Sequence, residues 1–392
     1  MYDQIREDTL FAMFYGGVTF MAMMASCYLL FRRANAIAPD ITPPARLRRW
    51  TGLYFASIAL SHVWYLPLFF KTSCDDILMT DLIGGVLDSI TVFPISIVIL
   101  FAMLQDHQRP LWPIAVMTAP ISLGMTACVA TRSDALYPVI YAYVLLMSIG
   151  LITYMVRATR KYSRWLRDNY ADLEHKEVWQ SFIVLAILLI MYVIYEYTND
   201  GLVYMYAMQV ICVVLICYLL WRVETLSDLN IQLAPAEAEV DGCQSPATDG
   251  KHQPADCKQQ LSEDIPQLTK DIPQNTLDNI GKLLQQHCTD TQFYLQHDLN
   301  ISQLSRAIGT NRYYLSQYFS SQGITYNAYI NNLRINHFIA LYREAVTAKR
   351  PFTALQLANE SGYRSYSTFS LAFQQRMGQN VRTWMNSINL NP

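Results

Sequence analysis

Seven long apolar runs within the first 221 residues restrict the fold of this 392-residue chain more than any other feature. They cover residues 10–31, 50–70, 82–104, 111–130, 136–155, 179–197 and 203–220. Each has about 18 to 23 residues, and an α-helix of that length crosses a hydrocarbon layer of about 30 Å. Buried helices of a large soluble protein are the alternative, but these are normally shorter and carry charges along one stripe. The pattern therefore predicts a membrane domain of seven helices over residues 1–222.

The Lys and Arg residues in the short connections between these runs predict the orientation of the domain. The first, third and fifth connections carry twelve of them, whereas the N-terminal segment and the other connections carry three. Because cationic connections stay in the cytoplasm, we expect the N-terminus outside and the chain after Arg222 in the cytoplasm. The first run lacks the cationic start and the cleavage site of a secretory signal, so we expect it to be retained.

The sequence shows no sign of metal binding or catalysis. None of the eight cysteines pairs at a ligand spacing. Cys74 and Cys128 would lie near the outer face, where a disulfide and two free thiols are both compatible with the topology. A phosphate-binding glycine loop, a zinc-protease HExxH motif and a nucleophile elbow are all missing from the sequence. We therefore expect no cofactor, no metal, no catalytic residue and no enzymatic activity.

Two segments of different character follow the last apolar run. The residues Val223, Leu226, Asn230 and Leu233 have the spacing of a very short coiled-coil seam, which would make a homodimer, but a plain helix end is the alternative. Residues 234–268 are rich in Pro, Ala, Gln and acids, with seven carboxylates against two lysines. A stretch of low hydrophobicity and negative net charge cannot form an apolar core, so we expect it to be a flexible tether. We place a helical extension and an acidic linker at 223–269.

The tail, residues 270–392, has the opposite charge, with eleven Lys and Arg residues against six Asp and Glu. A basic module favours an anionic partner, either nucleic acid or anionic lipid. Two segments of this tail share one plan: an apolar residue with a small neighbour stands five positions before a glycine, and two apolar residues four apart follow it. The first uses Leu304, Ser305, Gly309, Leu315 and Phe319, and the second uses Leu357, Ala358, Gly362, Phe369 and Phe373. This spacing predicts two helix-turn-helix units, joined by a longer helix over residues 325–345.

The tail over residues 277–386 resembles the DNA-binding domain of the AraC/XylS family of bacterial transcription regulators. The resemblance is carried by LSRAIGTNRYYLSQYF at 304–319, YINNLRINHFIALY at 329–342 and LANESGYRSYSTFSLAFQQRMG at 357–378. It implies two helix-turn-helix units on one connecting helix, each placing a recognition helix in major-groove faces about 34 Å apart. The chain departs from the family at Asn380-Val381, where a Thr-Pro-like pair is common, and at Leu371, where many members have a basic residue.

The resemblance also implies which residues face DNA. In the first unit these are Asn311, Arg312, Tyr313, Ser316 and Gln317, and in the second Arg364, Ser365, Tyr366, Ser367 and Ser370. A solvated helix face is the alternative for each of them, and Asn311 and Ser365 also suit helix N-caps. We expect Tyr363, directly after the second turn glycine, to lie in the core. Phosphate contacts would position the module, and only some of these side chains would read bases.

Two ionisable residues stand inside the apolar runs, His62 in the second and Asp88 in the third. Ionisable groups at membrane depth usually face the interior of a helix bundle, where they are paired or functional. They form a candidate ligand or proton site, and an internal structural hydrogen bond is the alternative. We also expect Pro67, Pro94 and Pro120 to bend their helices.

These observations together predict an all-α protein of the bacterial cytoplasmic (inner) membrane, multi-pass, with an AraC-type DNA-binding domain at 270–392 in the cytoplasm. Its partners would be double-stranded DNA and the lipid bilayer, and its membrane domain would sense an unknown small-molecule or envelope signal. The signal would act by changing dimer geometry through 223–233 or by proteolytic release of the tail. The alternative function is that of a transporter or membrane receptor whose tail is a regulatory or protein-docking domain.

Overall fold

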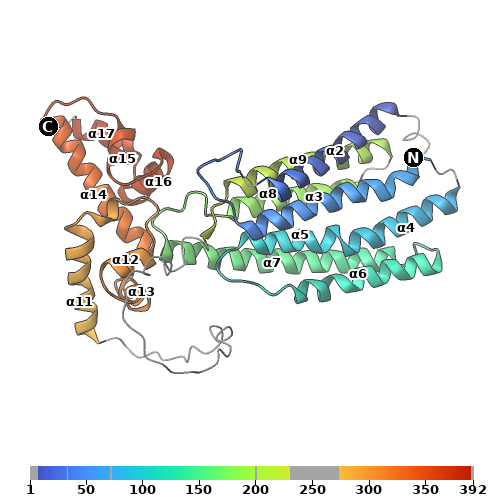
Figure 1. Cartoon of the computed structure of the whole chain (residues 1–392), viewed down its shortest axis with the longest axis horizontal. Helices are drawn as coiled ribbons and strands as arrows, with labels where there is room; N and C mark the ends of the chain where they lie inside the picture. The colour runs from blue at the N-terminus through green and yellow to red at the C-terminus, as the bar shows by residue number, and fades with distance from the viewer. Residues whose placement is uncertain (1–7, 33, 71–72, 199–200, 230–272, 390–392) are drawn as a thin grey trace, which may run out of the picture. The chain divides into compact units, whose positions relative to one another are not determined.

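The computed structural model describes residues 8–32, 34–70, 73–198, 201–229 and 273–389. The chain divides into two compact units. The N-terminal unit comprises Met1–Leu166 and Leu173–Gln232, and the C-terminal unit comprises Arg167–Asp172 and Leu233–Pro392. Every regular element in the described ranges is a helix, which confirms the predicted all-α fold (Figure 1).

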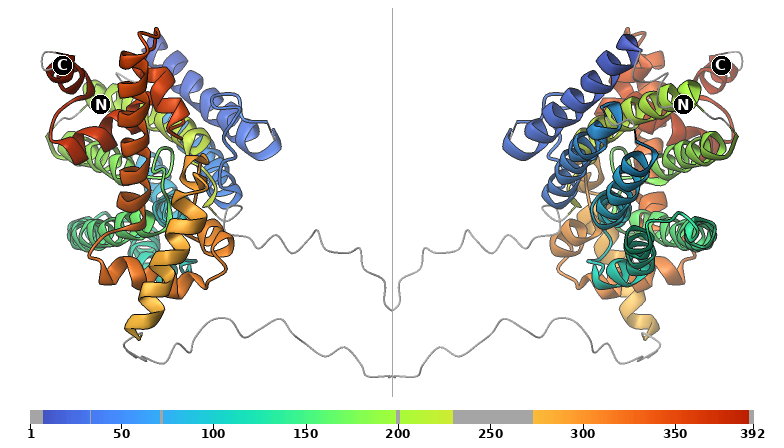
Figure 2. Two further views of the ribbon diagram at one scale, coloured as in Figure 1. Left: turned by 90° about the vertical axis from the view of Figure 1, so that its left-hand side faces the viewer. Right: turned by 90° about the vertical axis from the view of Figure 1, so that its right-hand side faces the viewer.

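The N-terminal unit is a bundle of long helices. They are α2 (Thr9–Phe31), α3 (Ala45–Tyr65), the 3-10 turn η1 (Leu66–Phe69), α4 (Cys74–Ile90), α5 (Val92–Met103), α6 (Trp112–Thr131), α7 (Tyr137–Asn169), α8 (Trp179–Thr198) and α9 (Leu202–Thr225). Helix α2 packs against both α3 and α9, so the first and last helices of the unit are neighbours (Figures 1 and 2). The last three residues of α7 already belong to the C-terminal unit.

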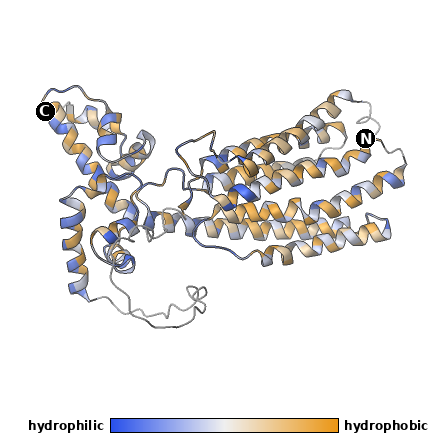
Figure 3. Ribbon diagram, viewed as in Figure 1, coloured by the Kyte–Doolittle hydropathy of each residue, from blue (hydrophilic) through white to orange (hydrophobic). Residues whose placement is uncertain are grey.

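Six helical stretches in the described residues are long and apolar enough to cross a membrane. They are Thr9–Phe31, Ala45–Phe69, Cys74–Met103, Trp112–Thr131, Tyr137–Asn169 and Leu202–Thr225. Apolar residues run along these helices (Figure 3), and Leu10, Val116 and Leu146 are more than half exposed, as expected of a surface that faces lipid. The sixth predicted run, residues 179–197, coincides with α8, whose described apolar part, Trp179–Met191, is shorter than a span, so that crossing stays a prediction.

Two of the three prolines expected to bend helices lie at interruptions. Pro94 is in the first turn of α5, directly after the break at Thr91 that separates α5 from α4. A proline ring clashes with the carbonyl four residues earlier and supplies no N–H, so the two helices cannot join smoothly there. Pro67 lies in η1, which follows the end of α3. Pro120 lies within α6, which continues past it without a break.

The chain leaving α9 is fixed to the connections between other helices. The Ser227 carbonyl accepts a hydrogen bond from Nε2 of Gln105 at 3.0 Å, and the Asp228 amide donates to the Thr42 carbonyl at 2.9 Å. Beside them, the buried carboxylate of Glu224 accepts a hydrogen bond from the Tyr28 hydroxyl at 2.9 Å. The first and third connections, both predicted to be cytoplasmic, therefore lie at the same end of the N-terminal unit as the exit of α9.

These contacts correct the helical extension expected after residue 222. Helix α9 ends at Thr225, and Leu226 has an extended backbone. Val223 and Leu226 are completely buried within the N-terminal unit, so they form no exposed seam. The hydrogen bonds of the next residues to other connections replace those that a longer helix would make. Asn230, Leu233 and the predicted linker lie outside the described residues.

The C-terminal unit consists of short helices around one long one. Its elements are α11 (Gln274–Leu284), the π turn η2 (Gln285–Thr289), the 3-10 turn η3 (Phe293–Leu295), α12 (Ile301–Ala307), α13 (Arg312–Ser321), α14 (Tyr326–Thr347), α15 (Ala354–Glu360), α16 (Tyr366–Met377) and α17 (Val381–Asn389). Helices α11 to α13 gather at one end of α14, and α15 to α17 gather at the other (Figure 1).

Each end of α14 has a separate apolar core. The first core contains Leu304, Leu315 and Phe319 together with residues of α11 and the start of α14. The second contains Phe369 and Phe373 together with residues of α17 and the rest of α14. Its other buried members are Ile335, Phe338, Tyr342, Leu357, Ala358, Tyr363, Ala372, Val381 and Trp384. Burying an aromatic or aliphatic side chain contributes about 1.5 to 3 kcal/mol, so each half has its own driving force for folding.

The two turn glycines differ in how much space surrounds them. Gly362 has φ of 87° and Gly309 has φ of 68°, which is the left-handed region that L-residues rarely adopt. A Cβ at Gly362 would lie 2.8 Å from the backbone of Leu295, whereas a Cβ at Gly309 would meet nothing within 4 Å. The second glycine therefore permits a close backbone approach as well as a turn.

We expect Gly362→Ala to destabilise the C-terminal unit more than Gly309→Ala does. The αL conformation costs both variants about 1 to 2 kcal/mol, but only Gly362→Ala adds a backbone clash that forces α15 or η3 to shift. Urea titration of the lipid-embedded protein, with proteolysis of the C-terminal unit as readout, measures the difference. Equal losses for the two variants would show that η3 does not approach the turn this closely.

Candidate nucleic-acid interface

The first helix-turn-helix unit is built from α12 and α13, and local hydrogen bonds fix both helix starts. Asn300 and Gln303 form a reciprocal capping box at the start of α12. Asn311 caps α13, because its side-chain oxygen accepts a hydrogen bond from the Tyr313 amide at 2.9 Å. Leu315 and Phe319, four residues apart, are buried on the inner face of α13, as the spacing predicts.

The outer face of α13 carries the residues that the resemblance assigns to DNA reading. Arg312, Tyr313, Ser316 and Gln317 are all exposed, and Arg312 and Ser316, like Tyr313 and Gln317, are four residues apart, the spacing at which two side chains share one face of a helix. Asn311 is exposed as well, although its amide oxygen is engaged by the cap. The first unit thus brings its predicted residues together on one polar surface.

Arg312 has a partner that the sequence did not indicate. Its guanidinium Nη2 donates a hydrogen bond to Oδ1 of Asn169, at 2.5 Å. Asn169 is the last residue of α7, and it is buried. A separation of 143 residues and an intervening linker leave no pattern in the sequence from which this pair could be inferred.

The second unit is built from α15 and α16 on the same plan. Thr353 caps α15, and Ser365 caps α16 by accepting from the Thr368 amide at 3.3 Å. Phe369 and Phe373 are completely buried on the inner face of α16. Tyr363, after the turn glycine, is also completely buried, as expected for a core residue.

The outer face of α16 is less polar than that of α13. Tyr366 and Ser367 are exposed, and Ser370 is half-buried. Leu371 is 59% exposed, so at the position where many family members have a basic residue this chain presents an apolar side chain to the surroundings. The outer face of α16 therefore presents an apolar side chain at this position, and how many contacts the second unit makes to DNA stays a prediction.

Two arginines near α16 are held by other parts of the unit. Arg364 forms an ion pair with Asp298 at 3.2 Å, but both side chains are partly exposed and such pairs contribute little. Arg376, in the last turn of α16, donates to Oδ1 of Asn336 at 2.7 Å and to the carbonyl of Asn332 on α14. Arg364 can exchange its partner for a phosphate at small cost, whereas Arg376 serves to join α16 to α14.

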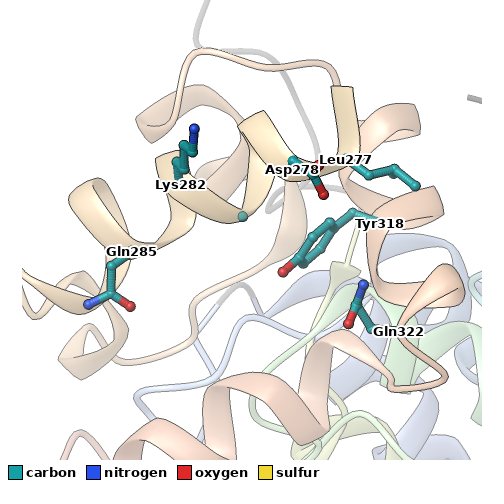
Figure 4. A pocket seen from close by; sticks show the side chains of 7 residues that line it. Leu277, Asp278, Lys282, Gln285, Tyr318 and Gln322 are labelled. Atoms are coloured by element: carbon teal, nitrogen blue, oxygen red, sulfur yellow. The ribbon is translucent and has the colours of Figure 1, made fainter. Parts of the chain in front are cut away.

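A shallow groove runs between α11 and α13 on this unit (Figure 4). It has a volume of about 350 Å³ and is lined by Leu277, Asp278, Gly281, Lys282, Gln285, Tyr318 and Gln322. The Tyr318 ring points from α13 toward α11, where Gly281 leaves room for it. This contact fastens α11 to the inner side of α13, and the Tyr318 ring is not part of the outer face of α13.

The two ionisable residues of the apolar helices each have an internal partner. Nε2 of His62 lies 3.0 Å from Oε1 of Gln209, and its Nδ1 lies 2.9 Å from the Ile58 carbonyl. Oδ2 of Asp88 accepts a hydrogen bond from the Ser61 hydroxyl at 3.1 Å. Hydrogen bonds of this kind are what the structural alternative requires, and a ligand role for His62 and Asp88 stays a prediction.

His62 also lines a cavity in the N-terminal unit. The cavity has a volume of about 740 Å³ and is walled mainly by apolar and aromatic side chains, including Tyr15, Phe20 and Phe69. The Tyr15 ring lies beside the imidazole of His62 at a tilt of 47°, with 4.6 Å between the ring centroids. Asp88 is not among the residues that line this cavity. Among the described residues no group of His, Cys, Asp and Glu side chains is arranged to hold a metal ion.

The comparisons with known proteins concern the C-terminal unit. The model of a family described as a helix-turn-helix domain matches residues 304–387. No curated protein and no solved structure matches the chain. The matched range contains both turn glycines, both candidate recognition helices and the connecting α14. The match and the geometry together support a DNA-binding helix-turn-helix domain in this part of the chain.

Proposed function

We propose that this chain is a membrane-bound transcription regulator that binds promoter DNA through both helix-turn-helix units. The observation that carries the proposal is the exposed polar face of α13 within the range that matches the helix-turn-helix family. The same chain has six helical stretches that are apolar enough to hold it in a bilayer. The membrane domain would then keep the regulator at the cytoplasmic face of the inner membrane.

The two units would contribute differently to DNA recognition. Arg312 and Gln317 on α13 have the side chains that make paired hydrogen bonds to guanine and adenine in the major groove. Ser316, Ser367 and Ser370 have hydroxyl groups that suit phosphate oxygens, which position a protein without reading sequence. The first unit would therefore supply most of the base discrimination, and the second would supply register and additional affinity.

The N-terminal unit would supply the sensor. Its cavity of about 740 Å³ has a size and an apolar lining typical of small-molecule sites. His62, at the edge of the cavity, is a polar group that a ligand would reach, and Asp88 would act through its own hydrogen-bonded neighbours. A signal from a small molecule or from the envelope would alter the packing of these helices, and the C-terminal unit would respond.

Chromatin immunoprecipitation of the intact protein tests the proposed function. We expect enrichment of a small set of promoter fragments, each with paired half-sites about one helical turn apart. The same fragments should bind the purified, lipid-embedded protein in a mobility-shift assay. A protein that enriches no fragment and binds no duplex would disprove the proposal.

Arg312→Ala is expected to weaken binding to a recovered promoter fragment by about 1 to 3 kcal/mol and to relax specificity at one base position. Arg312→Lys is the matched control, because it keeps the charge but loses the planar fork that guanine recognition needs. Titrations with the recovered fragment and with a scrambled duplex measure both effects. If Arg312→Ala binds the two duplexes as the parent protein does, Arg312 does not contact DNA.

A membrane-impermeant maleimide applied to spheroplasts tests the proposed orientation. We expect labelling at Cys74, which is exposed at the start of α4, and no labelling after Cys74→Ala. Cys243 and Cys257 in the predicted linker should react only after permeabilisation. Cys288 should not react in either case, because burial raises the pKa of its thiol to about 12. Labelling of a protein with both Cys74→Ala and Cys128→Ala on intact spheroplasts would place the linker outside and reverse the topology.

A further inference from the structure

The C-terminal unit contains a short segment from a distant part of the chain, Arg167–Asp172, which we call the docking segment. It comprises the end of α7 and the three residues that follow. The Ala171 amide donates a hydrogen bond to the Leu299 carbonyl at 3.0 Å, and Tyr170 forms an antiparallel bridge with Asn300. Ala171 is 1% exposed and belongs to the first apolar core of the unit. The docking segment therefore adds a strand-like contact to the loop that precedes α12.

A buried ion pair anchors the docking segment. Oδ1 of Asp172 lies 2.9 Å from Nη1 of Arg334, and both side chains are almost completely buried. The other carboxylate oxygen of Asp172 accepts a hydrogen bond from the Asp298 amide at 3.1 Å. Arg334 is held from the opposite side by the carbonyls of Tyr294 and Gln296, at 2.8 and 2.7 Å. These two carbonyls fix the guanidinium within the unit, with Nη1 directed at the carboxylate of Asp172.

Two asparagines complete the interaction. Nδ2 of Asn327, on α14, donates to the carbonyls of Tyr170 and Ala171, so the surface also recognises the backbone of the segment. Asn169 accepts the hydrogen bond from Arg312 described above. The docking segment thus contacts α14, the start of α12 and the exposed face of α13 at once.

We infer that the C-terminal unit carries a binding surface whose occupant is this chain's own docking segment, and that the docked segment competes with DNA for Arg312. The first part depends on contacts within the unit alone. The second part rests on the proposed function, because it requires Arg312 to contact DNA. While Asn169 holds the guanidinium, the first recognition helix presents its strongest base-reading group only after that hydrogen bond breaks.

Docking of this segment and binding of DNA are coupled, because both require the guanidinium of Arg312. Linkage requires the effect to be reciprocal, so DNA that captures Arg312 weakens docking by the same factor by which docking weakens DNA binding.

Hydrogen–deuterium exchange of the full-length protein in lipid nanodiscs tests docking without DNA. We expect the amides of Ala171 and Asp298 to be protected in the parent protein and to exchange about tenfold faster or more in Asp172→Asn, because a charge-assisted bond is lost. Arg167→Gln, at an exposed residue of the same segment, should leave the protection of both amides unchanged. Exchange of residues 170–172 at the rate of an unstructured chain in the parent protein would overturn the inference, whatever the variants do.

Binding of DNA by the same nanodisc samples tests the competition. The probe is a mixed-sequence duplex pool long enough for two successive major-groove faces. Asn169→Ala should bind the pool about three- to tenfold more tightly than the parent protein, the range expected for releasing one hydrogen bond. In an Arg312→Ala background the same substitution should have no effect, since there is no guanidinium left to release.

The outcomes separate this inference from the proposed function. A parent protein that binds no duplex contradicts the proposed function, while protection of Ala171 would still establish the docking surface. A parent protein that binds the pool, with Asn169→Ala unchanged in affinity, contradicts the competition and leaves the proposed function intact.

Discussion

Replacing Arg334 with alanine is expected to lower the free energy of unfolding of the C-terminal unit by about 3 to 5 kcal/mol. Arg334 has no exposed surface, and its guanidinium lies 5.4 Å from the centroid of the Tyr363 ring. The substitution leaves the carboxylate of Asp172 buried without its cation and two backbone carbonyls without a donor. Each of these losses carries a desolvation penalty that nothing else in the pocket offsets.

Arg343→Ala is the matched control for this measurement. Arg343 lies on the same helix, α14, but is exposed, so its removal should change the unfolding free energy by no more than about 0.5 kcal/mol. Proteolysis along a urea titration, with the protein in nanodiscs, reports the stability of the C-terminal unit in each variant. A loss below about 1 kcal/mol for Arg334→Ala, the size typical of an exposed pair, would show that the pair with Asp172 is not buried in solution.

Binding of a promoter fragment is expected to weaken about 1,000-fold as monovalent salt rises from about 50 to 200 mM, the loss that accompanies about six phosphate contacts. The physical cause is the release of counterions from the DNA when Lys and Arg side chains replace them. The C-terminal tail, residues 270–392, has eleven such side chains, of which the few on the outer faces of the unit can meet phosphates. Fluorescence anisotropy at several salt concentrations gives the slope of the logarithm of the binding constant against the logarithm of the salt concentration.

A variant with one fewer phosphate contact serves as the control for the salt dependence. Arg364→Gln should reduce the slope by about one, because its exposed ion pair with Asp298 is exchanged easily for a phosphate. Arg343→Gln should leave the slope unchanged if α14 does not face the duplex. A slope near zero for the parent protein would mean that phosphates are not the ligands of the basic tail.

Local patterns predicted most of the fold. The apolar runs gave the helices of the N-terminal unit because helix length and hydropathy are properties of one continuous stretch. The spacing of apolar residues around each glycine predicted the helix-turn-helix units for the same reason. Leu315 and Phe319, and likewise Phe369 and Phe373, are four residues apart and buried, as that spacing requires. The end of α9 at Thr225 was missed, because hydrogen bonds to connections more than a hundred residues away stop the helix.

The candidate interface could be predicted only in part. The resemblance assigned Arg312 and Gln317 to the outer face of α13, where both are exposed, and their contact with DNA stays a prediction. The docking of Asp172 on Arg334 spans 162 residues and joins a polar loop to a polar position of a helix. No composition or periodicity marks such a pair, since an acidic residue in a loop and an arginine on a helix are each ordinary by themselves. Only the fold shows that both are buried.

The connection between the two helix-turn-helix units has a consequence for how their target sites can change. Helix α14 has 22 residues, which at 1.5 Å per residue is a rod of about 33 Å, close to one turn of B-form DNA. A flexible loop between the two units could gain or lose a residue and still let both units reach their half-sites, whereas a rigid helix could not. Each residue inserted into α14 would rotate one helix-turn-helix unit relative to the other by about 100°. Under the proposed function, the length of α14 therefore sets the spacing between the two half-sites.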